Sequence, residues 1–336
     1  SIYSDDVNIF IIGMLSSLLA AGLWLLMASS KGWPVSTTHS IVGAIVGFVL
    51  ISKGASNVSW GTVGGIASSW ITSPLVSGLM AFLLYLSAKH LILDRNNPTK
   101  AAVSVIPFYS FFVTAVICLV TARKGLKHVG INWTDNEIYL FTFVLSLLVS
   151  VFTFLFLFFK SSKLSSNVEN QFGILMIITA CAMAFAHGSN DVANAIGPIA
   201  AVVSIVTSDG TIQTSSELNS WVLLLGAVGI VFGLAILGRH VIKTVGEKIT
   251  TLTPSLGFSA NMATASTVLA ASYLGFPIST THTLVGGVIG VGLARGYKYL
   301  DLNSIKRLFL SWIITIPVGA TFTILFYVIL RLLFNV

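Results

Sequence analysis

The sequence predicts an all-α, polytopic membrane protein, and its composition and its hydropathy pattern both support this fold class. Of the 336 residues, 55% are hydrophobic and only 9% are charged, whereas soluble domains carry about 25% charged residues. Several continuous apolar runs reach about 20 residues, which is the length that a helix needs to cross a bilayer. The chain is therefore expected to work inside the lipid bilayer.

The apolar runs define ten expected helical segments with short polar connections. Lys and Arg gather in several of these connections, as orientation signals do, so the net charge of +7 does not indicate nucleic-acid binding. The two cysteines, Cys118 and Cys181, lie in apolar runs without metal-ligand spacing and are interpreted as packing residues; no cofactor is expected. The segments are 8–30, 33–52, 60–92, 101–122, 137–159, 171–206, 218–238, 255–274, 277–294 and 304–334.

An internal repeat organises these segments. Residues 34–43 read Pro-Val-Ser-Thr-Thr-His-Ser-Ile-Val-Gly and residues 277–286 read Pro-Ile-Ser-Thr-Thr-His-Thr-Leu-Val-Gly, with seven of ten positions identical. Further along, Ser-Trp-Ile at 69–71 is repeated at 311–313. Such self-similarity indicates a duplicated unit. We expect a first repeat at 1–92 with a hairpin at 8–52, connecting transmembrane helices at 93–170, and a second repeat at 171–336 with a hairpin at 255–294.

The distribution of cationic loops predicts that the two repeats have opposite topology. If residues 160–170 are cytoplasmic, the cations between 239 and 248 are also cytoplasmic. A re-entrant or broken helical hairpin at 255–294 then keeps Arg295 and Arg307 inside, and the same count places the ends of the first hairpin outside. Inverted repeats of this kind are the architecture of many secondary transporters. The loop with Arg123, Lys124 and Lys127 is the exception, because it would lie outside.

Three hydroxyl residues follow the turn in each hairpin, namely Ser36, Thr37 and Thr38 in the first and Ser279, Thr280 and Thr281 in the second. Ser and Thr are favourable helix N-caps, and a helix start offers free N–H groups and a partial positive charge. Two such helix starts predict an anion site. The alternative is a capped helix start without a ligand, which the duplication disfavours.

A histidine follows the hydroxyl residues in both copies, at His39 and His282. These side chains could donate to an anion or titrate. Alternatively, each could satisfy a backbone carbonyl. The sequence leaves these roles open.

The segment 171–206 carries the acidic residue that lies deepest in an apolar run. His187, Asn190, Asp191 and Asn194 are three or four residues apart and so share a helix face. A carboxylate at membrane depth is costly and indicates a functional site. Gly188 and Gly197-Pro198 predict a broken helix here. Carboxylate and amide oxygens suit a small hard cation, and we expect Na⁺ at Asp191; a proton or a buried polar network are the alternatives.

At these residues the chain resembles the inorganic phosphate transporter (PiT) family. The family's Gly-x-Asn-Asp-x-x-Asn element matches Gly188-Ser-Asn-Asp-Val-Ala-Asn194, and both Pro-x-Ser-Thr-Thr-His hairpins look like those of the family. The resemblance implies a cation-coupled phosphate symporter, often a homodimer. It also implies two sets of site residues. Those for phosphate are Ser36, Thr37, Thr38, Asn190, Asn194, Ser279, Thr280 and Thr281, and those for the cation are Asn190, Asp191 and Asn194.

Two features depart from the family pattern. The first repeat lacks its own Asn-Asp element, so either the native chain extends upstream by about 60 residues or more, or these residues have been removed or left out. Many members also carry a glutamate where this chain has Asn261, and an amide cannot titrate, which favours Na⁺ over H⁺ as the coupling ion. Asn261, His39, His187 and His282 are secondary site candidates.

The sequence is therefore interpreted as a multi-pass transporter that imports phosphate with a cation by alternating access, in a plasma (inner) membrane. The alternatives are an H⁺-coupled phosphate or sulfate carrier of the same fold, or a passive anion channel. An intramembrane hydrolase is disfavoured, because such an enzyme needs one nucleophile rather than two symmetric copies.

Overall fold

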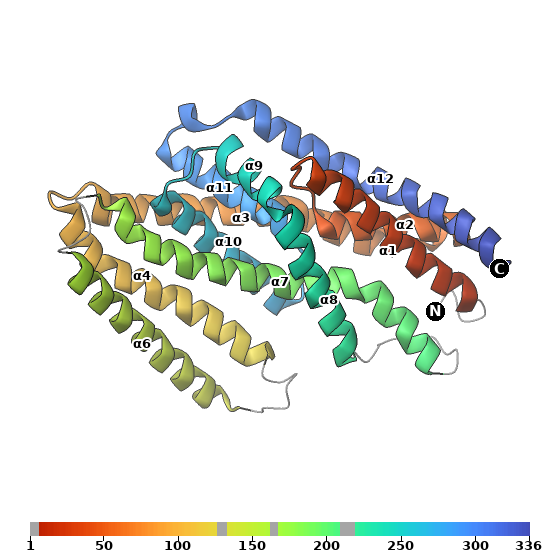
Figure 1. The fold of residues 1–336 in the computed structure, drawn as a ribbon, viewed down its shortest axis with the longest axis horizontal. Helices are drawn as coiled ribbons and strands as arrows, with labels where there is room; N and C mark the ends of the chain where they lie inside the picture. The colour runs from red at the N-terminus through yellow and green to blue at the C-terminus, as the bar shows by residue number, and fades with distance from the viewer. Residues whose placement is uncertain (1–6, 126–132, 162–166, 209–218) are drawn as a thin grey trace. The chain divides into compact units, whose positions relative to one another are not determined.

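The computed structural model describes residues 7–125, 133–161, 167–208 and 219–336, and over these residues the chain is helical without a β-strand (Figure 1). Seven of the described helical stretches are long and apolar enough to cross a membrane. Lys127, which entered the topology argument, lies outside the described residues. The main helices are α1 (Val7–Ser30), α2 (Thr37–Lys53), α3 (Trp60–Ala88), α4 (Pro98–Val120), α6 (Asp135–Ser161), α7 (Glu169–Thr207), α8 (Ser220–Gly233), α9 (Arg239–Lys248), α10 (Pro254–Leu274), α11 (Thr280–Arg295) and α12 (Leu302–Phe334). Short helical pieces, Lys89–Leu93, Thr121–Gly125 and Leu234–Gly238, extend α3, α4 and α8.

These helices follow the expected apolar segments closely, with one extension. The cationic stretch after residue 238 was expected to be a loop, but α9 continues the helix from α8 through Arg239–Lys248. Lys, Arg and Glu are good helix formers, and Lys243 pairs with Glu247 one turn later at 4.0 Å. The polar residues after the apolar segment therefore extend the helix instead of forming a loop.

The prediction of a broken helix at 171–206 is wrong. Helix α7 runs without interruption for 39 residues from Glu169 to Thr207, with Pro198 inside it. A proline removes one backbone hydrogen bond, and membrane helices tolerate that loss where neighbouring groups satisfy the freed carbonyl. The Asn-Asp motif is therefore displayed on an intact helix.

The chain divides into two compact units that are not the two sequence repeats. Unit 1 comprises Ser1–Ser69, Gly188–Ile249 and Asp301–Val336, and unit 2 comprises Trp70–His187 and Thr250–Leu300. Unit 1 contains the first hairpin, α1 and α2, packed on α12. Unit 2 contains the second hairpin, α10 and α11, together with most of α3. Each hairpin is thus combined with the Ser-Trp-Ile helix from the other copy.

Glycines let the hairpin helices approach their partners closely. In unit 1, a Cβ on Gly43 or Gly47 would lie 2.6 or 2.5 Å from a backbone carbonyl oxygen of α12. In unit 2, a Cβ on Gly286 or Gly290 would clash with the carbonyl oxygens of Pro74 and Gly78 on α3. Both pairs have the small-xxx-small spacing that brings membrane helices into backbone contact. The two hairpins therefore use the same packing device.

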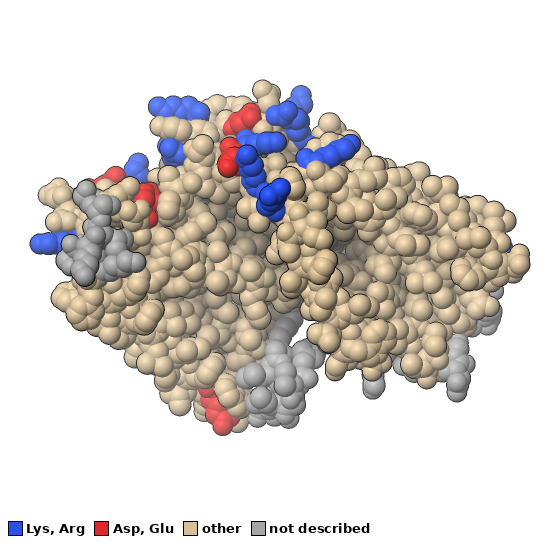
Figure 2. Space-filling view, viewed as in Figure 1, with Lys and Arg blue, Asp and Glu red and all other residues tan. Residues whose placement is uncertain are grey.

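The outer surface is apolar between the helix ends. Large side chains such as Phe152, Phe159 and Leu332 are 64%, 71% and 74% exposed. Figure 2 shows a face on which charged side chains gather near the upper and left margins, with one acidic group at the bottom, and the rest of the visible described surface is almost entirely uncharged. Soluble monomers rarely expose apolar patches of this extent, so this surface fits contact with lipid.

Candidate functional site

The tip of the first hairpin is a capped helix start in unit 1. Ser36 is the N-cap of α2, and its hydroxyl oxygen accepts a hydrogen bond of 3.2 Å from the backbone N–H of His39. Thr37 and Thr38 form the first turn; Thr38 is buried and Thr37 is half-buried. The hydroxyl residues therefore lie where the helix N–H groups and the partial positive charge of the dipole are concentrated.

The buried carboxylate of α7 contacts this tip. Asp191 is only 5% exposed. One of its oxygens accepts a 3.0 Å hydrogen bond from the Thr37 hydroxyl, and the other accepts a 3.1 Å bond from the Asn190 side-chain amide. Hydrogen bonds to a charged acceptor are roughly twice as strong as neutral ones. The structure thus supplies donors for a carboxylate that lies away from water.

The third member of the Asn-Asp motif contacts the next hydroxyl. The Asn194 amide donates a 3.0 Å hydrogen bond to the Thr38 hydroxyl oxygen, which leaves the Thr38 proton to be donated elsewhere. Unit 1 therefore brings together two stretches that are more than 150 residues apart in the sequence. The oxygens gathered at this place are of the carboxylate, amide and hydroxyl types that hard cations prefer.

His39 anchors the first hairpin to α12. Its Nδ1 lies 3.4 Å from the Trp312 carbonyl oxygen, and a carbonyl only accepts, so this nitrogen carries the proton. In addition, the Trp312 indole N–H donates to the Pro34 carbonyl oxygen at 3.1 Å. This contact is the backbone-satisfying role that the sequence left as an alternative for the histidine.

The tip of the second hairpin has the same construction in unit 2. Ser279 is the N-cap of α11, and its hydroxyl oxygen accepts a 3.2 Å bond from the N–H of His282. Ser279 and Thr280 are each 1% exposed, and Thr281 is half-buried. The turn before them is made by Gly275, whose φ of +77° is readily adopted only by glycine.

His282 repeats the anchoring contact with α3. Its Nδ1 lies 3.4 Å from the Trp70 carbonyl oxygen. The residue four positions after Trp70 is Pro74, which has no N–H to donate along the helix. The histidine therefore supplies a donor where proline removes one, and it does so beside the hydroxyl residues that a ligand would contact.

The other two secondary candidates lie in unit 2. Asn261 is half-buried on α10, and its amide donates to the Met176 sulfur at 3.6 Å. His187 is half-buried on α7, at the residue where unit 2 ends. This contact of Asn261 is one of helix packing between α10 and α7.

Sequence reasoning missed the partners of the two histidines. The Ser-Trp-Ile match was evident, but nothing local shows that a tryptophan carbonyl accepts from a histidine of the other copy.

The sequence also gave no indication of the role of Glu169, whose carboxylate accepts from the Ser255 backbone N–H at 2.9 Å and from its hydroxyl at 2.7 Å. Glu169 thereby caps the start of α10 from another helix. For the histidines, the duplicated tryptophan was the signal that could have suggested the contact with a tryptophan carbonyl. For Glu169 the sequence contains no such signal.

The helical fold, the apolar exterior and the buried carboxylate beside a hydroxyl-bearing helix start define a multi-pass integral membrane protein with a candidate ion site. Residues 1–323 match the family model described as the phosphate transporter family. The chain therefore belongs to that family and is a transporter rather than an enzyme.

Individual relatives agree with this assignment. The chain is 48% identical to a protein of Haemophilus influenzae that is named as a phosphate permease, over 99% of this chain and 81% of the relative. It is 40% identical to the chloroplastic inorganic phosphate transporter 2-1 of Arabidopsis thaliana, over 94% of this chain and 58% of the relative. A solved structure described as the sodium-dependent phosphate transporter superposes with a TM-score of 0.84 at 40% identity, covering 97% of this chain and 81% of the other.

Proposed function

We propose that this protein imports inorganic phosphate together with Na⁺ by alternating access. The observation that carries the proposal is the contact between the Asp191 carboxylate and the Thr37 hydroxyl at the first hairpin tip. Asp191 is the expected cation ligand, and Thr37 lies at the helix start that is expected to bind the anion. Both residues belong to unit 1. The structural relative is described as sodium-dependent, which supports Na⁺ as the coupling ion.

The charge of Asp191 explains why the two ions would move together. Two negative charges about 5 Å apart repel by about 3 kcal/mol at an effective dielectric constant of about 20. A phosphate at the hydroxyl tip would meet this cost, and a cation at Asp191 would offset it. Each ion therefore makes the burial of the other less costly, which is the physical content of coupling.

The donor set favours a singly charged hard cation over a transition metal. Within the described residues no group of three His, Cys, Asp or Glu side chains could hold a metal ion. Asp191, Asn190 and Asn194 offer one carboxylate and two amides, and these oxygens suit Na⁺. Asn261 cannot carry a proton, which supports Na⁺ over H⁺ at that position.

We assign phosphate binding to the second hairpin tip as well. Ser279, Thr280 and Thr281 repeat the hydroxyl pattern of Ser36, Thr37 and Thr38, and the serine of each set caps its helix in the same way. Half-helix N-termini aimed at an anionic group are a recurrent device in secondary transporters. In this proposal, the two tips belong to inverted repeats, and the transporter works as a homodimer in the plasma membrane.

Uptake of radiolabelled phosphate into proteoliposomes tests the proposal. The full-length native chain is reconstituted, and a Na⁺ gradient and a H⁺ gradient are imposed in turn, with excess unlabelled sulfate as competitor. We expect saturable uptake that follows the Na⁺ gradient, runs uphill and is indifferent to sulfate.

The other outcomes separate the alternatives. Uptake that follows only the H⁺ gradient would show proton coupling on the same fold. Competition by sulfate would indicate a broader oxyanion carrier. Phosphate flux that is never uphill in any gradient would identify a passive channel and contradict coupled transport.

A further inference from the structure

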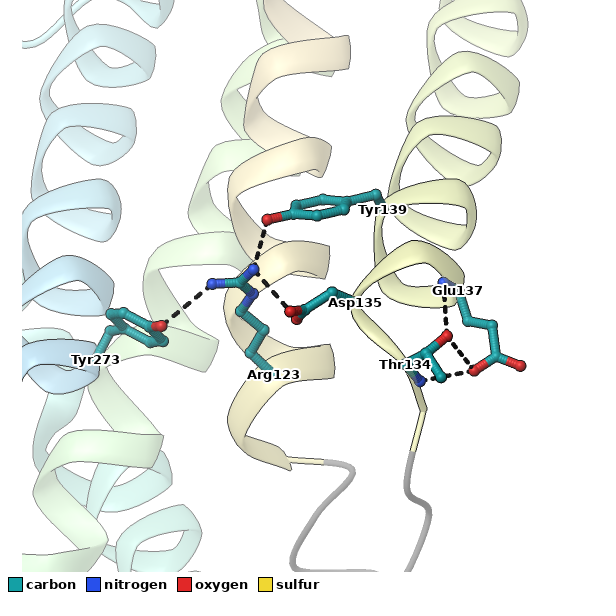
Figure 3. Close-up of polar contacts among 6 residues, drawn as sticks. All are labelled: Arg123, Thr134, Asp135, Glu137, Tyr139 and Tyr273. Atoms are coloured by element: carbon teal, nitrogen blue, oxygen red, sulfur yellow. Dashed lines mark hydrogen bonds and ion pairs between the residues drawn. The ribbon is translucent and has the colours of Figure 1, made fainter.

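Outside the candidate site, unit 2 contains a cluster of polar side chains centred on Arg123, at the end of α4. One guanidinium nitrogen, Nη1, donates to the Tyr273 hydroxyl at 3.2 Å, and Nη2 donates to the Tyr139 hydroxyl at 2.5 Å and pairs with the Asp135 carboxylate at 3.3 Å. Figure 3 shows the guanidinium between these three groups, with the Tyr273 side chain reaching it from a different helix. The Arg123 carbon Cζ also lies 5.3 Å from the centre of the Tyr139 ring.

The cluster joins three elements. Arg123 lies in the short helical extension of α4, Asp135 and Tyr139 lie in the first turns of α6, and Tyr273 lies in the last turn of α10. The bonds from Arg123 to Asp135 and Tyr139 join α4 to α6 and so stay within one helical hairpin. The bond to Tyr273 is different, because it ties that hairpin to the second hairpin, which carries the Ser279–Thr281 hydroxyls.

Tyr273 is close in sequence to the hydroxyl residues of the second hairpin tip, so its bond to Arg123 can affect their position. It lies two residues before Gly275, where the chain turns with a φ of +77°, and six residues before the capping Ser279. Fixing the end of α10 therefore fixes the start of the turn that delivers Ser279 and Thr280. Beyond Tyr273 the turn itself is exposed, with Phe276 at 59%, and the chain is buried again from Ile278, which is 3% exposed.

We propose that Arg123 is a positioning residue for transport, a latch that holds the tip of the second hairpin against the end of the α4–α6 hairpin. The inference rests on the proposed function, since alternating access requires a hairpin tip to change its surroundings. The latch is closed in this structure and opens when the tip moves. It acts through Tyr273 and has no contact with phosphate.

The strength of the contact suits a latch that must open. The bond that ties the tip is a single hydrogen bond of 3.2 Å from Arg123 to the Tyr273 hydroxyl. The Arg123 side chain is 27% exposed, so water can replace this bond when the tip moves. A planar guanidinium can serve three partners at once, whereas a lysine ammonium is a point charge without this fork. Arg123→Lys should therefore restore the function only in part.

The test follows the tip directly. Cys118 and Cys181 are first replaced by alanine, and Ile278→Cys is introduced as a reporter for a membrane-impermeant maleimide, because Ile278 lies in the tip and is only 3% exposed while the latch is closed. We expect Arg123→Gln and Tyr273→Phe to raise the labelling rate about two- to fivefold, the shift in an equilibrium that the loss of one partly exposed hydrogen bond would cause.

Phosphate uptake supplies the second measurement. The apparent KM for phosphate should rise in the same order as the labelling rate, with Arg123→Lys between the unsubstituted latch and Arg123→Gln, while the maximal rate does not fall. Tyr297→Phe is the matched control, because Tyr297 is an exposed tyrosine that follows α11, beyond the other end of the second hairpin. It should change neither the labelling rate nor KM.

Unchanged labelling and unchanged KM in both Arg123→Gln and Tyr273→Phe would overturn the latch, even if thermal stability fell. An equal response in Tyr297→Phe would overturn it as well. If the unsubstituted protein took up no phosphate in any gradient while Arg123→Gln still changed the labelling, the proposed substrate would be wrong and the latch would stand.

Discussion

In the proposed function, the Asp191 carboxylate lies where an anion and a cation are both held. Its two oxygens accept from Thr37 and Asn190. In Asp191→Asn the amide oxygen can still accept from Asn190, and the new amide NH2 group can donate to the Thr37 hydroxyl, which is able to accept. This makes the charge separable from the structure by a single substitution.

Asp191→Asn should abolish Na⁺-dependent phosphate uptake while the protein remains folded, because the neutral amide no longer offsets a cation. Uptake in proteoliposomes and elution as a single species in detergent measure the two properties. Asp94→Asn, at an exposed position after α3, is the control and should leave uptake intact. Uptake that persists with full Na⁺ dependence in Asp191→Asn would rule out this role.

Thr280→Val should raise the apparent KM for phosphate by about tenfold, because a hydrogen bond to a charged group contributes about 1.5 kcal/mol or more. The comparison is Thr267→Val. Thr267 is also buried, but its hydroxyl donates to the Ala263 carbonyl oxygen of its own helix. Equal KM values for the two variants would remove Thr280 from the phosphate site.

At the scale of the helix, the hairpins depend on close backbone contact and on the histidine anchors. The helix pairs α2–α12 and α11–α3 have the same two features: glycines spaced four residues apart and a histidine that donates to a tryptophan carbonyl. Neither feature contacts a ligand directly, but both determine where the hydroxyl residues lie.

Gly290→Ala should destabilise the protein by about 1–3 kcal/mol, the usual cost of overpacking a close contact, because the new methyl group would meet the Gly78 carbonyl oxygen. Thermal unfolding in detergent measures the change. Gly229→Ala in α8 is the matched control, since a Cβ there meets nothing within 4 Å. If both variants unfolded at the same temperature, close packing would not be the function of Gly290.

His282→Ala should destabilise unit 2 by about 1–3 kcal/mol, because it removes the donor to the Trp70 carbonyl. His282→Asn carries an amide nitrogen close to the position of Nδ1 and should recover most of the stability. Thermal unfolding of the two variants side by side distinguishes them. If asparagine were as destabilising as alanine, the hydrogen bond would not be the reason for the histidine.

At the scale of the whole chain, the prediction is that the two sequence repeats have opposite topology in the membrane. It requires the loops that end the two hairpins to lie on opposite sides of the membrane. Asn57 follows the first hairpin and Lys298 follows the second, and both are exposed.

Asn57→Cys should react with an impermeant maleimide from the outside and Lys298→Cys from the inside, in a background in which the native cysteines are replaced. Labelling of intact cells before and after permeabilisation measures the side. Reaction of both cysteines from the same side would exclude inverted repeats. The unsubstituted background, which has no reporter cysteine, provides the blank.

The sequence by itself determined the membrane class, the helical segments and the identity of the hydroxyl and Asn-Asp residues. These features are local, because a helix that faces lipid must be apolar along its whole length, and a helix start shows its capping residue directly. The candidate site residues could be named because Asp191 is costly in an apolar run and because the hydroxyl motif occurs twice.

Only the tertiary structure decided which helices meet. Hydropathy alone did not predict that α7 continues through Pro198, that each hairpin packs on a helix of the other copy, or that Arg123 joins three elements at the end of α10. The Thr37–Asp191 and His39–Trp312 contacts link positions 154 and 273 residues apart. Such contacts depend on the shapes of packed side chains and on the absence of a Cβ at glycine. The periodicity of apolar residues along the chain therefore does not predict which helix packs against which.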